Sequence, residues 1–168
     1  MDSLEELFDN TLQDIYSAEK QFLKAMTKLA DLAVNAKLKA TIHDHILQTQ
    51  NHVRRLEQVA DLRGIKPSGK VCKAAQGLVE EANEHLQEFK AGAALDAAII
   101  LCAQKNEHYE ISTYGTLIEW ANLLRLPDVA ELLQDSLNEE KAADHLLTSA
   151  ARPVNADARK QPQEAVSK

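Results

Sequence analysis

Residues 42–59 read IHDHILQTQNHVRRLEQV, and their spacing predicts a helix with an unusual buried face. Positions 42, 45, 49, 52, 56 and 59 alternate by three and four, as residues on one face of an α-helix do. That face carries isoleucine, histidine, threonine, histidine, leucine and valine. An ordinary core would place leucine at the three polar positions. The pattern therefore indicates a helix that directs polar side chains into a core.

Helical spacing continues on both sides of this stretch. A turn at residues 34–35, a break at residues 65–70 (IKPSGK) and a turn at residues 125–128 interrupt it. The predicted helices cover about residues 2–33, 36–64, 73–89, 93–124 and 128–151. Two long helical hairpins joined by a crossover that carries a short extra helix describe an all-α, ferritin-like four-helix bundle. This bundle is expected over residues 1–151, and the polar residues 152–168 are expected to form a disordered tail.

The composition narrows the class of protein. Hydrophobic residues make up 45% of the 168 residues, whereas glycine (5) and proline (4) are scarce, which favours helices. The net charge is −7 without a basic stripe, so nucleic acid and anionic membranes are poor candidate partners. No apolar run is long enough to span a membrane, and the acidic amino terminus is unlike a secretory signal. Because Cys72 and Cys102 fit neither a disulfide framework nor a zinc motif, a cytoplasmic location is expected.

Ionisable residues also occupy the predicted apolar faces of the other long helices. They are Glu19 in the first, Glu107 and Glu110 in the helix over 93–124, and Glu139 and Glu140 in the last. In an antiparallel hairpin, residues equally far from the turn lie at the same level. This places Glu19 level with about residue 50, and Glu110 level with about residue 143. The polar groups of both hairpins are therefore expected to converge near the middle of the bundle.

Carboxylates gathered in a core need compensation, because an unpaired buried charge is costly and close neighbours repel one another. They persist by protonation, by pairing with buried cations or by binding metal. No lysine or arginine shares their level on the apolar faces, unless Lys105 or Lys141 folds inward. Two divalent metal ions would neutralise four glutamates and use histidines as neutral ligands. We predict a metal site formed by Glu19, His45, His52, Glu107, Glu110 and Glu140.

Some members of this set have alternative interpretations. His45 lies about six residues, or roughly 9 Å, from the level of Glu19, and a hydrogen-bonded core histidine explains it equally well. A solvated face also explains Glu139 and Glu140, and the sequence leaves open whether only one of them points inward. The sequence does not decide whether Gln48, Glu139 or Asp144 joins the site. The remaining histidines are expected at the surface, namely His43, His85, His108 and His145.

Several short motifs resemble one known family. They are the run at residues 13–21 (QDIYSAEKQ), residues 107–110 (EHYE) with 114–117 (YGTL), and residues 137–141 (LNEEK). Together they resemble the YciE/YciF family of ferritin-like bacterial stress proteins, over about residues 2–150. The resemblance implies stress-linked expression and a homodimer, and it leaves the chemistry of the protein undefined.

A looser similarity to rubrerythrin-type di-iron bundles implies roles for individual residues. Glu19 resembles the glutamate of the first helix, Glu107 and Glu110 resemble a pair of which one usually bridges the metals, and residues 139–140 resemble the glutamate of the last helix. Residues 49–52 (TQNH) take the place of a Glu-x-x-His motif, with threonine where glutamate is expected. A further departure is Gln48, which stands where the closer family usually has glutamate and brings no charge.

These observations predict a cytoplasmic stress-response metalloprotein that binds two iron ions per chain, or manganese. The similarity to di-iron bundles implies reaction with peroxide or dioxygen, or oxidation of Fe(II), and whether the protein is an enzyme stays open. The alternative is a non-enzymatic dimeric helical bundle whose metal site is partly degraded and which acts through its surface as a structural or interaction protein.

Overall fold

The computed structural model describes residues 3–160. Over this range the chain forms five α-helices and no β-strand, which confirms the predicted all-α fold. The helices are α1 (Leu4–Leu32), α2 (Ala36–Arg63), α3 (Lys73–Glu88), α4 (Ala93–Leu123) and α5 (Pro127–Lys160). None of them has the length of apolar sequence that a membrane-spanning segment requires.

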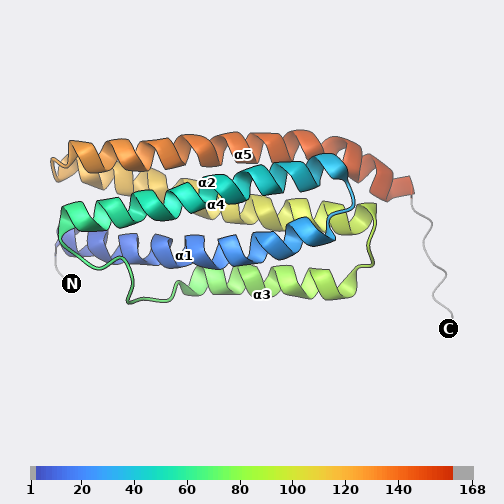
Figure 1. Ribbon diagram of the computed structural model, residues 1–168, viewed down its shortest axis with the longest axis horizontal. Helices are drawn as coiled ribbons and strands as arrows, with labels where there is room; N and C mark the ends of the chain where they lie inside the picture. Colours follow the sequence, from blue (N-terminus) through green and yellow to red (C-terminus); the bar gives the residue numbers. More distant parts are fainter. Residues whose placement is uncertain (1–2, 161–168) are drawn as a thin grey trace.

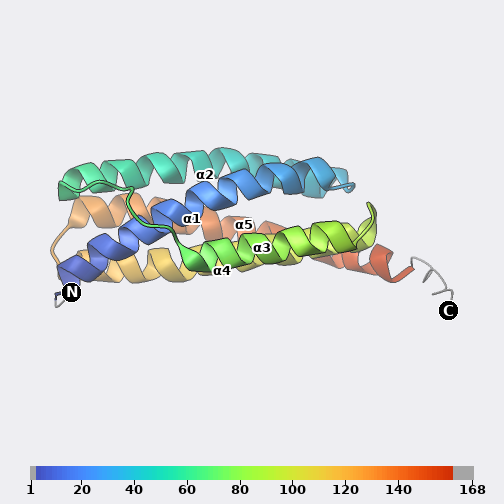
Figure 2. The same ribbon diagram turned by 90° about the horizontal axis from the view of Figure 1, so that it is seen from below.

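The four long helices form a bundle in which α1 packs against α2 and α4, and α5 packs against α2 and α4 (Figure 1). The crossover runs back along the bundle, so that α2 and α4 point in the same direction while each hairpin is antiparallel. The short helix α3 belongs to this crossover and lies outside the bundle against α1 and α4 (Figure 2). One long connection between two hairpins is the predicted ferritin-like topology.

Local capping explains where the helices begin and end. The side chains of Ser3, Asn35 and Cys72 accept hydrogen bonds from the backbone N–H groups of the first turns of α1, α2 and α3. Gly64 ends α2 with φ of 68°, a left-handed conformation that glycine adopts without steric cost. Pro127 occupies the first position of α5, where its missing N–H is not needed.

Buried Asp96 ties the two hairpins together at one end of the bundle. It lies in the first turn of α4, and its carboxylate accepts hydrogen bonds from the backbone N–H groups of Val34 and Asn35, both at 2.8 Å. The turn between α1 and α2 is thereby fixed to the start of α4. This contact sets the register between the hairpins, and so the levels at which their side chains meet.

Two apolar clusters fill the bundle and leave a polar layer between them. One cluster includes Phe8 on α1 and Leu117 on α4, and the other includes Leu38 on α2 and Leu147 on α5. In α2, for example, the buried residues between the clusters are His45, Thr49 and His52. The polar groups are thus held between two dry layers.

The carboxyl-terminal helix is longer than the sequence predicts. Because α5 continues to Lys160, the prediction of a disordered tail is wrong for residues 152–160. Pro153 lies inside the helix, where it removes one backbone hydrogen bond. Val154, only 2% exposed, belongs to the same apolar cluster as Leu38, and this burial offsets the loss. Residues 161–168 of the predicted tail lie outside the described residues.

Candidate metal centre

All six predicted ligands lie in the polar layer at the middle of the bundle, and none is more than 5% exposed. Their helices contribute Glu19 from α1, His45 and His52 from α2, Glu107 and Glu110 from α4, and Glu140 from α5. Each side chain occupies the core face of its helix because the three-to-four spacing that buries its apolar neighbours also buries it. The chain thus collects four carboxylates and two imidazoles in one dry volume.

The six side chains form two groups that share one residue. The first group is His45, Glu107, Glu110 and Glu140, and the second group is Glu19, His52 and Glu140. Within each group, one donor atom from every residue lies within 4.8 Å of all the others. The two oxygens of Glu140 face different groups, Oε2 toward His45 and Oε1 toward His52. The resemblance implied a bridging residue from the α4 pair, whereas the residue common to both groups is on α5.

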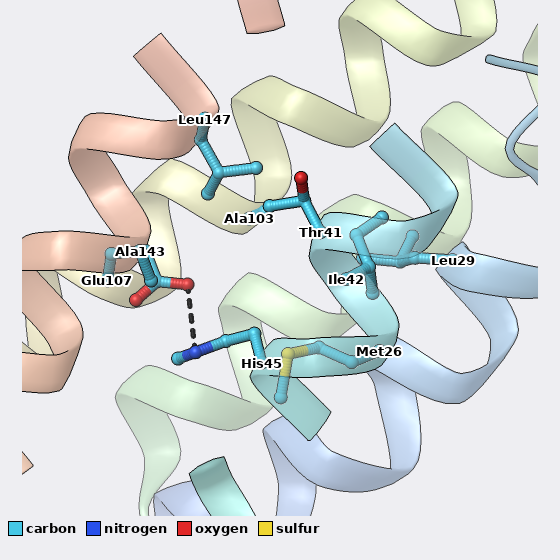
Figure 3. A pocket seen from close by; sticks show the side chains of 9 residues that line it. All are labelled: Met26, Leu29, Thr41, Ile42, His45, Ala103, Glu107, Ala143 and Leu147. Carbon is cyan, nitrogen blue, oxygen red and sulfur yellow. Dashed lines mark ion pairs between the residues drawn. The ribbon is translucent and has the colours of Figure 1, made fainter. Parts of the chain in front are cut away.

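His45 presents one ring nitrogen to the first group. Its Nε2 lies 3.1 Å from Glu107 Oε1 and 3.4 Å from Glu140 Oε2. Figure 3 marks the contact with Glu107 by a dashed line. The other nitrogen, Nδ1, lies 3.1 Å from the side-chain oxygen of Gln48, which can only accept a hydrogen bond. Gln48 therefore favours the tautomer with a proton on Nδ1, which leaves the Nε2 lone pair facing the carboxylates. Gln48 orients His45 and does not enter either group.

His52 is held in the same way in the second group. Its Nδ1 lies 2.7 Å from Glu140 Oε1 and 3.5 Å from Glu19 Oε1. Its Nε2 lies 2.7 Å from Glu139 Oε2. Arg55 donates two hydrogen bonds to the Glu139 carboxylate, at 2.8 and 2.9 Å. Glu140 is thus the residue that points inward, and Glu139 fixes the outer edge of the His52 ring.

The electrostatics of the metal-free cluster reflect crowded negative charge. Burial raises the pKa of Glu107 to about 7, and it raises the pKa of Glu110 and Glu140 well above the usual range of a carboxyl group. Burial alone would lower the pKa of His52, but the Glu140 and Glu19 carboxylates raise it to about 11. Without metal the cluster therefore holds protons on His52 and on some of its carboxyl groups.

Many buried polar atoms of the cluster have no hydrogen-bond partner among the described residues. They are Glu19 Oε2, Thr49 Oγ1, His52 Nδ1, Glu107 Oε2, Glu110 Oε1 and both carboxylate oxygens of Glu140. Although His52 Nδ1 and Glu140 Oε1 lie 2.7 Å apart, their angles do not suit a hydrogen bond. Each unpaired buried group costs about 1–3 kcal/mol. A set of carboxylate oxygens and imidazole nitrogens that are unpaired and face one another suits divalent iron, manganese or zinc.

Among the tyrosines in residues 3–160, Tyr114 is the one that contacts the cluster. It is fully buried on α4, and its hydroxyl donates a short hydrogen bond to Glu19 Oε1. Burial and the nearby carboxylates raise the pKa of Tyr114, which keeps the hydroxyl a donor. The hydroxyl of Tyr16 instead donates to Glu57, and that of Tyr109 lies 3.1 Å from Cys72 Sγ.

Arg55 is the residue that sequence reasoning missed. It lies on the edge of α2, outside the apolar face, and its long side chain reaches the level of the cluster from there. A signal was present, because Arg55 follows His52 by three residues and so shares its side of the helix. Lys105 does not fold inward, since it pairs with Glu81.

The remaining candidates lie apart from both groups. Asp144 accepts a hydrogen bond from Gln104 at 3.0 Å and lies 3.3 Å from His108 near the surface. The other histidines were expected at the surface: His43, His108 and His145 are exposed, whereas His85 is half-buried.

Comparison with known proteins gives the family. The model of the family described as a domain of unknown function, DUF892, matches residues 3–159. Protein YciF of Escherichia coli strain K12 is 42% identical over 152 residues, which cover 90% of this chain and 92% of that protein.

Solved structures agree with this relationship. The E. coli stress protein YciF matches with a TM-score of 0.87 at 40% identity, covering 96% of this chain and all of that one. YcfI of Rhodopseudomonas palustris, described as a candidate structural protein, matches with a TM-score of 0.86 at 44% identity, covering 89% and 95%. A ferritin-like di-iron carboxylate protein of Bacillus anthracis matches with a TM-score of 0.71 at 15% identity, covering 90% and 100%, and this likeness concerns the fold alone. The chain therefore belongs to the DUF892 family and is a relative of YciF with a ferritin-like fold.

Proposed function

We propose that this protein is a stress-response metalloprotein that binds two iron ions, or two manganese ions, in the core of its bundle. The observation that carries the proposal is the position of Glu140, whose two oxygens face two separate groups of buried donor atoms. A carboxylate shared by two ligand sets is the arrangement expected of a dinuclear centre. The relationship to the stress protein YciF supports a role in stress.

The first group would hold one ion through His45, Glu107 and Glu110, the second would hold the other through Glu19 and His52, and Glu140 would bridge them. Four carboxylates balance the charge of two divalent ions, so the lack of charge on Gln48 does not leave the centre short of negative charge. Bound iron or manganese supplies one-electron redox chemistry toward dioxygen or peroxide.

The protein's own groups orient the donors and move protons. Gln48 and Glu139 each hold the outer nitrogen of one histidine, so that the opposite nitrogen faces inward, and Tyr114 holds Oε1 of Glu19. Ligation at His52 Nδ1 requires loss of the proton that this ring carries in the metal-free protein. Glu139, paired with Arg55, keeps accepting the hydrogen bond from Nε2, so the proton is lost from Nδ1, the nitrogen that faces Glu140.

The test is to load the purified protein with Fe(II) without oxygen, measure bound iron, and then add peroxide or dioxygen. We expect about two ions per chain and fast development of Fe(III) absorption, as two-metal sites allow. Glu110→Ala should lose iron and slow the reaction, whereas Glu119→Ala, at an exposed position of α4, should not. Oxidation no faster than in Glu110→Ala would remove the catalytic part of the proposal.

The second candidate function is a structural or interaction protein that needs no metal, as a homodimer. It is favoured by the partial neutralisation of the cluster through His52, protonated carboxyl groups and the Arg55–Glu139 pair. The description of the R. palustris relative also points this way. Less than one metal per chain, with the same melting temperature after chelation, would favour this candidate. Light scattering on the protein as it elutes from a size-exclusion column measures its mass in solution and so tests whether it is a homodimer.

A further inference from the structure

Two neighbouring hollows lie on the outside of the bundle, where α1 meets the crossover. One, the lysine hollow, is lined by α1 and by residues 68–71 of the crossover and has a volume of about 330 Å³. The other, the apolar hollow, is lined by α1 and α3, which lie side by side in Figure 2, and has a volume of about 420 Å³. Both are lined by Gln21 and Lys24, so they adjoin. Each has a size typical of small-molecule sites.

Positive charge gathers around the lysine hollow. Lys20 and Lys24 line it from α1, and Lys70 lines it from the crossover. Lys20, Lys24 and Lys28 follow one another at four-residue steps, so they share one side of α1, where like charges disfavour the helix. The sequence as a whole has no basic stripe, and this short row becomes a patch because the fold adds Lys70. Among the described residues, neither hollow is lined by a carboxylate, although acidic residues outnumber basic ones by 26 to 19.

The hydroxyl of Ser17 has a hydrogen to donate into the lysine hollow, which it lines. Its oxygen accepts hydrogen bonds from the backbone N–H of Cys72 at 3.0 Å and from the side-chain amide of Gln21 at 3.2 Å. These two bonds use both lone pairs. Within residues 3–160 no acceptor takes the hydroxyl hydrogen. The Ser17 hydroxyl is therefore positioned to donate to a ligand.

The ammonium groups add further donors. Lys70 donates to Asn10 and Asp14, which fix its position and leave its third N–H unused. Lys24 is exposed and has no partner in the described part of the chain. Together with Ser17, these groups offer more donors than the two oxygens of a carboxylate can accept. A phosphate group, with three free oxygens and up to two negative charges, suits them better.

The apolar hollow continues from this charged end. Its floor is hydrocarbon, from Ala25, Leu29, Val79, Ala82 and Leu86. The polar groups at its edge are largely occupied, since Lys28 donates to the Asn83 side chain at 2.7 Å. A molecule whose phosphate lies in the lysine hollow would thus place the rest of its structure over apolar surface, where burial is favourable.

We propose that the two hollows form one binding site for an organic monophosphate with an apolar or aromatic body. The phosphate lies among Lys20, Lys24 and Ser17, and the body lies between α1 and α3. The site is separate from the metal centre, so the metal-free protein should bind the ligand.

Titration calorimetry on the metal-free protein at physiological salt tests the site, with 1-naphthyl phosphate as the probe. It should bind several-fold more tightly than inorganic phosphate, which lacks the body, and than 1-naphthol, which lacks the charge. Lys24→Gln should weaken its binding several-fold, because Lys24 lines both hollows. Lys37→Gln is the matched control, since it removes the same charge from an exposed position of α2. No binding at millimolar probe, or equal losses in both variants, overturns the proposal.

A second variant separates the two hollows. Ala25→Leu places a larger side chain in the apolar hollow and should weaken binding of 1-naphthyl phosphate. It should leave the binding of inorganic phosphate, followed by phosphorus NMR, unchanged. Ala40→Leu, at an exposed position of α2, is the control and should affect neither. Equal affinity of the wild-type protein for inorganic phosphate and 1-naphthyl phosphate would reduce the site to ion binding and overturn the proposal. Since no metal is present, these results are independent of whether the core binds iron.

Discussion

Glu140 lies within 3.4 Å of His45 and 2.7 Å of His52, and it has like-charged neighbours in Glu19 and Glu107. The sequence prediction placed Glu140 in the metal site, but helical periodicity could not decide whether the adjacent Glu139 joins it. A core-facing stripe is wide enough to include either residue. The choice depends on Arg55, whose side chain draws Glu139 to the edge of the bundle. Such a contact depends on the reach of a long side chain, which the three-residue spacing of His52 and Arg55 hints at but does not fix.

Removal of the outer partner of His52 should weaken metal binding without abolishing it. Glu139→Gln keeps the shape of the side chain but loses the carboxylate that accepts from His52 Nε2. Loss of such an orienting carboxylate typically lowers metal affinity about 10–100-fold. Titration calorimetry with Mn(II) measures the change, and Glu131→Gln, at an exposed position of α5, is the control. An affinity equal to wild type would show that Glu139 does not position His52.

Neutralising Glu110 should stabilise the metal-free protein. Burial raises the pKa of Glu110, and the neighbouring carboxylates Glu140, Glu19 and Glu107 raise it further, so its charge opposes folding. Glu110→Gln should raise the unfolding free energy of the metal-free protein by about 1 kcal/mol or more, as replacement of crowded buried charge often does. The same change should reduce the stabilisation gained from metal.

Denaturant unfolding with and without Mn(II) tests this pair of effects, with Glu119→Gln as the control on the same helix. A metal-free Glu110→Gln protein that is less stable than wild type would contradict this prediction, because it would show that the folded protein compensates the charge of Glu110.

The stability of the metal-free protein should fall as pH rises. Glu107 has a folded pKa of about 7 against an ordinary 4.5, so its stabilising contribution is present below 4.5 and is lost as pH rises through 7. His52 has a folded pKa of about 11 against an ordinary 6.5, so its contribution is full below 6.5 and is lost as pH rises through 11. Both act in one direction between about pH 5 and 9.

Thermal unfolding across this pH range measures the effect, and Glu107→Gln should flatten the part between about pH 5 and 7. Metal affinity should change in the opposite direction and rise with pH, because ligation displaces protons. A metal-free protein that becomes more stable between pH 6 and 9 would contradict the assigned protonation of the cluster.

At the scale of helices, the turns and breaks predicted from sequence agree with the structure because capping and turn residues are local signals. Gly64 and Pro127 mark the end of α2 and the start of α5 as expected. The extension of α5 past Pro153 was not predictable in this way, since it depends on the burial of Val154 against distant helices. Tertiary packing there outweighs the local penalty of proline.

The link between hairpins through Asp96 should matter for stability. Asp96→Ala leaves the N–H groups of Val34 and Asn35 without their partner and removes two charge-assisted hydrogen bonds of 2.8 Å. We expect a loss of about 2–4 kcal/mol in unfolding free energy. Asp31→Ala, an exposed aspartate near the same turn, should change it little. Equal effects of both changes would show that the contact does not hold the hairpins in register.

At the scale of the whole molecule, antiparallel hairpin geometry was sufficient to predict that the polar groups converge. It did not predict two groups, because a level estimated from the turns is uncertain by about one helical turn. His45 therefore looked remote from the level of Glu19, and the structure explains the offset by placing the two residues in different groups.

The most direct test of a shared two-metal core is anomalous diffraction at the iron edge from crystals loaded with Fe(II) without oxygen. The account predicts two peaks on either side of the Glu140 carboxylate, about 3.5–4 Å apart, as in other two-metal sites. One peak should lie among His45, Glu107 and Glu110, and the other between Glu19 and His52. No peak in the polar layer, or iron only at the surface of the bundle, would contradict it.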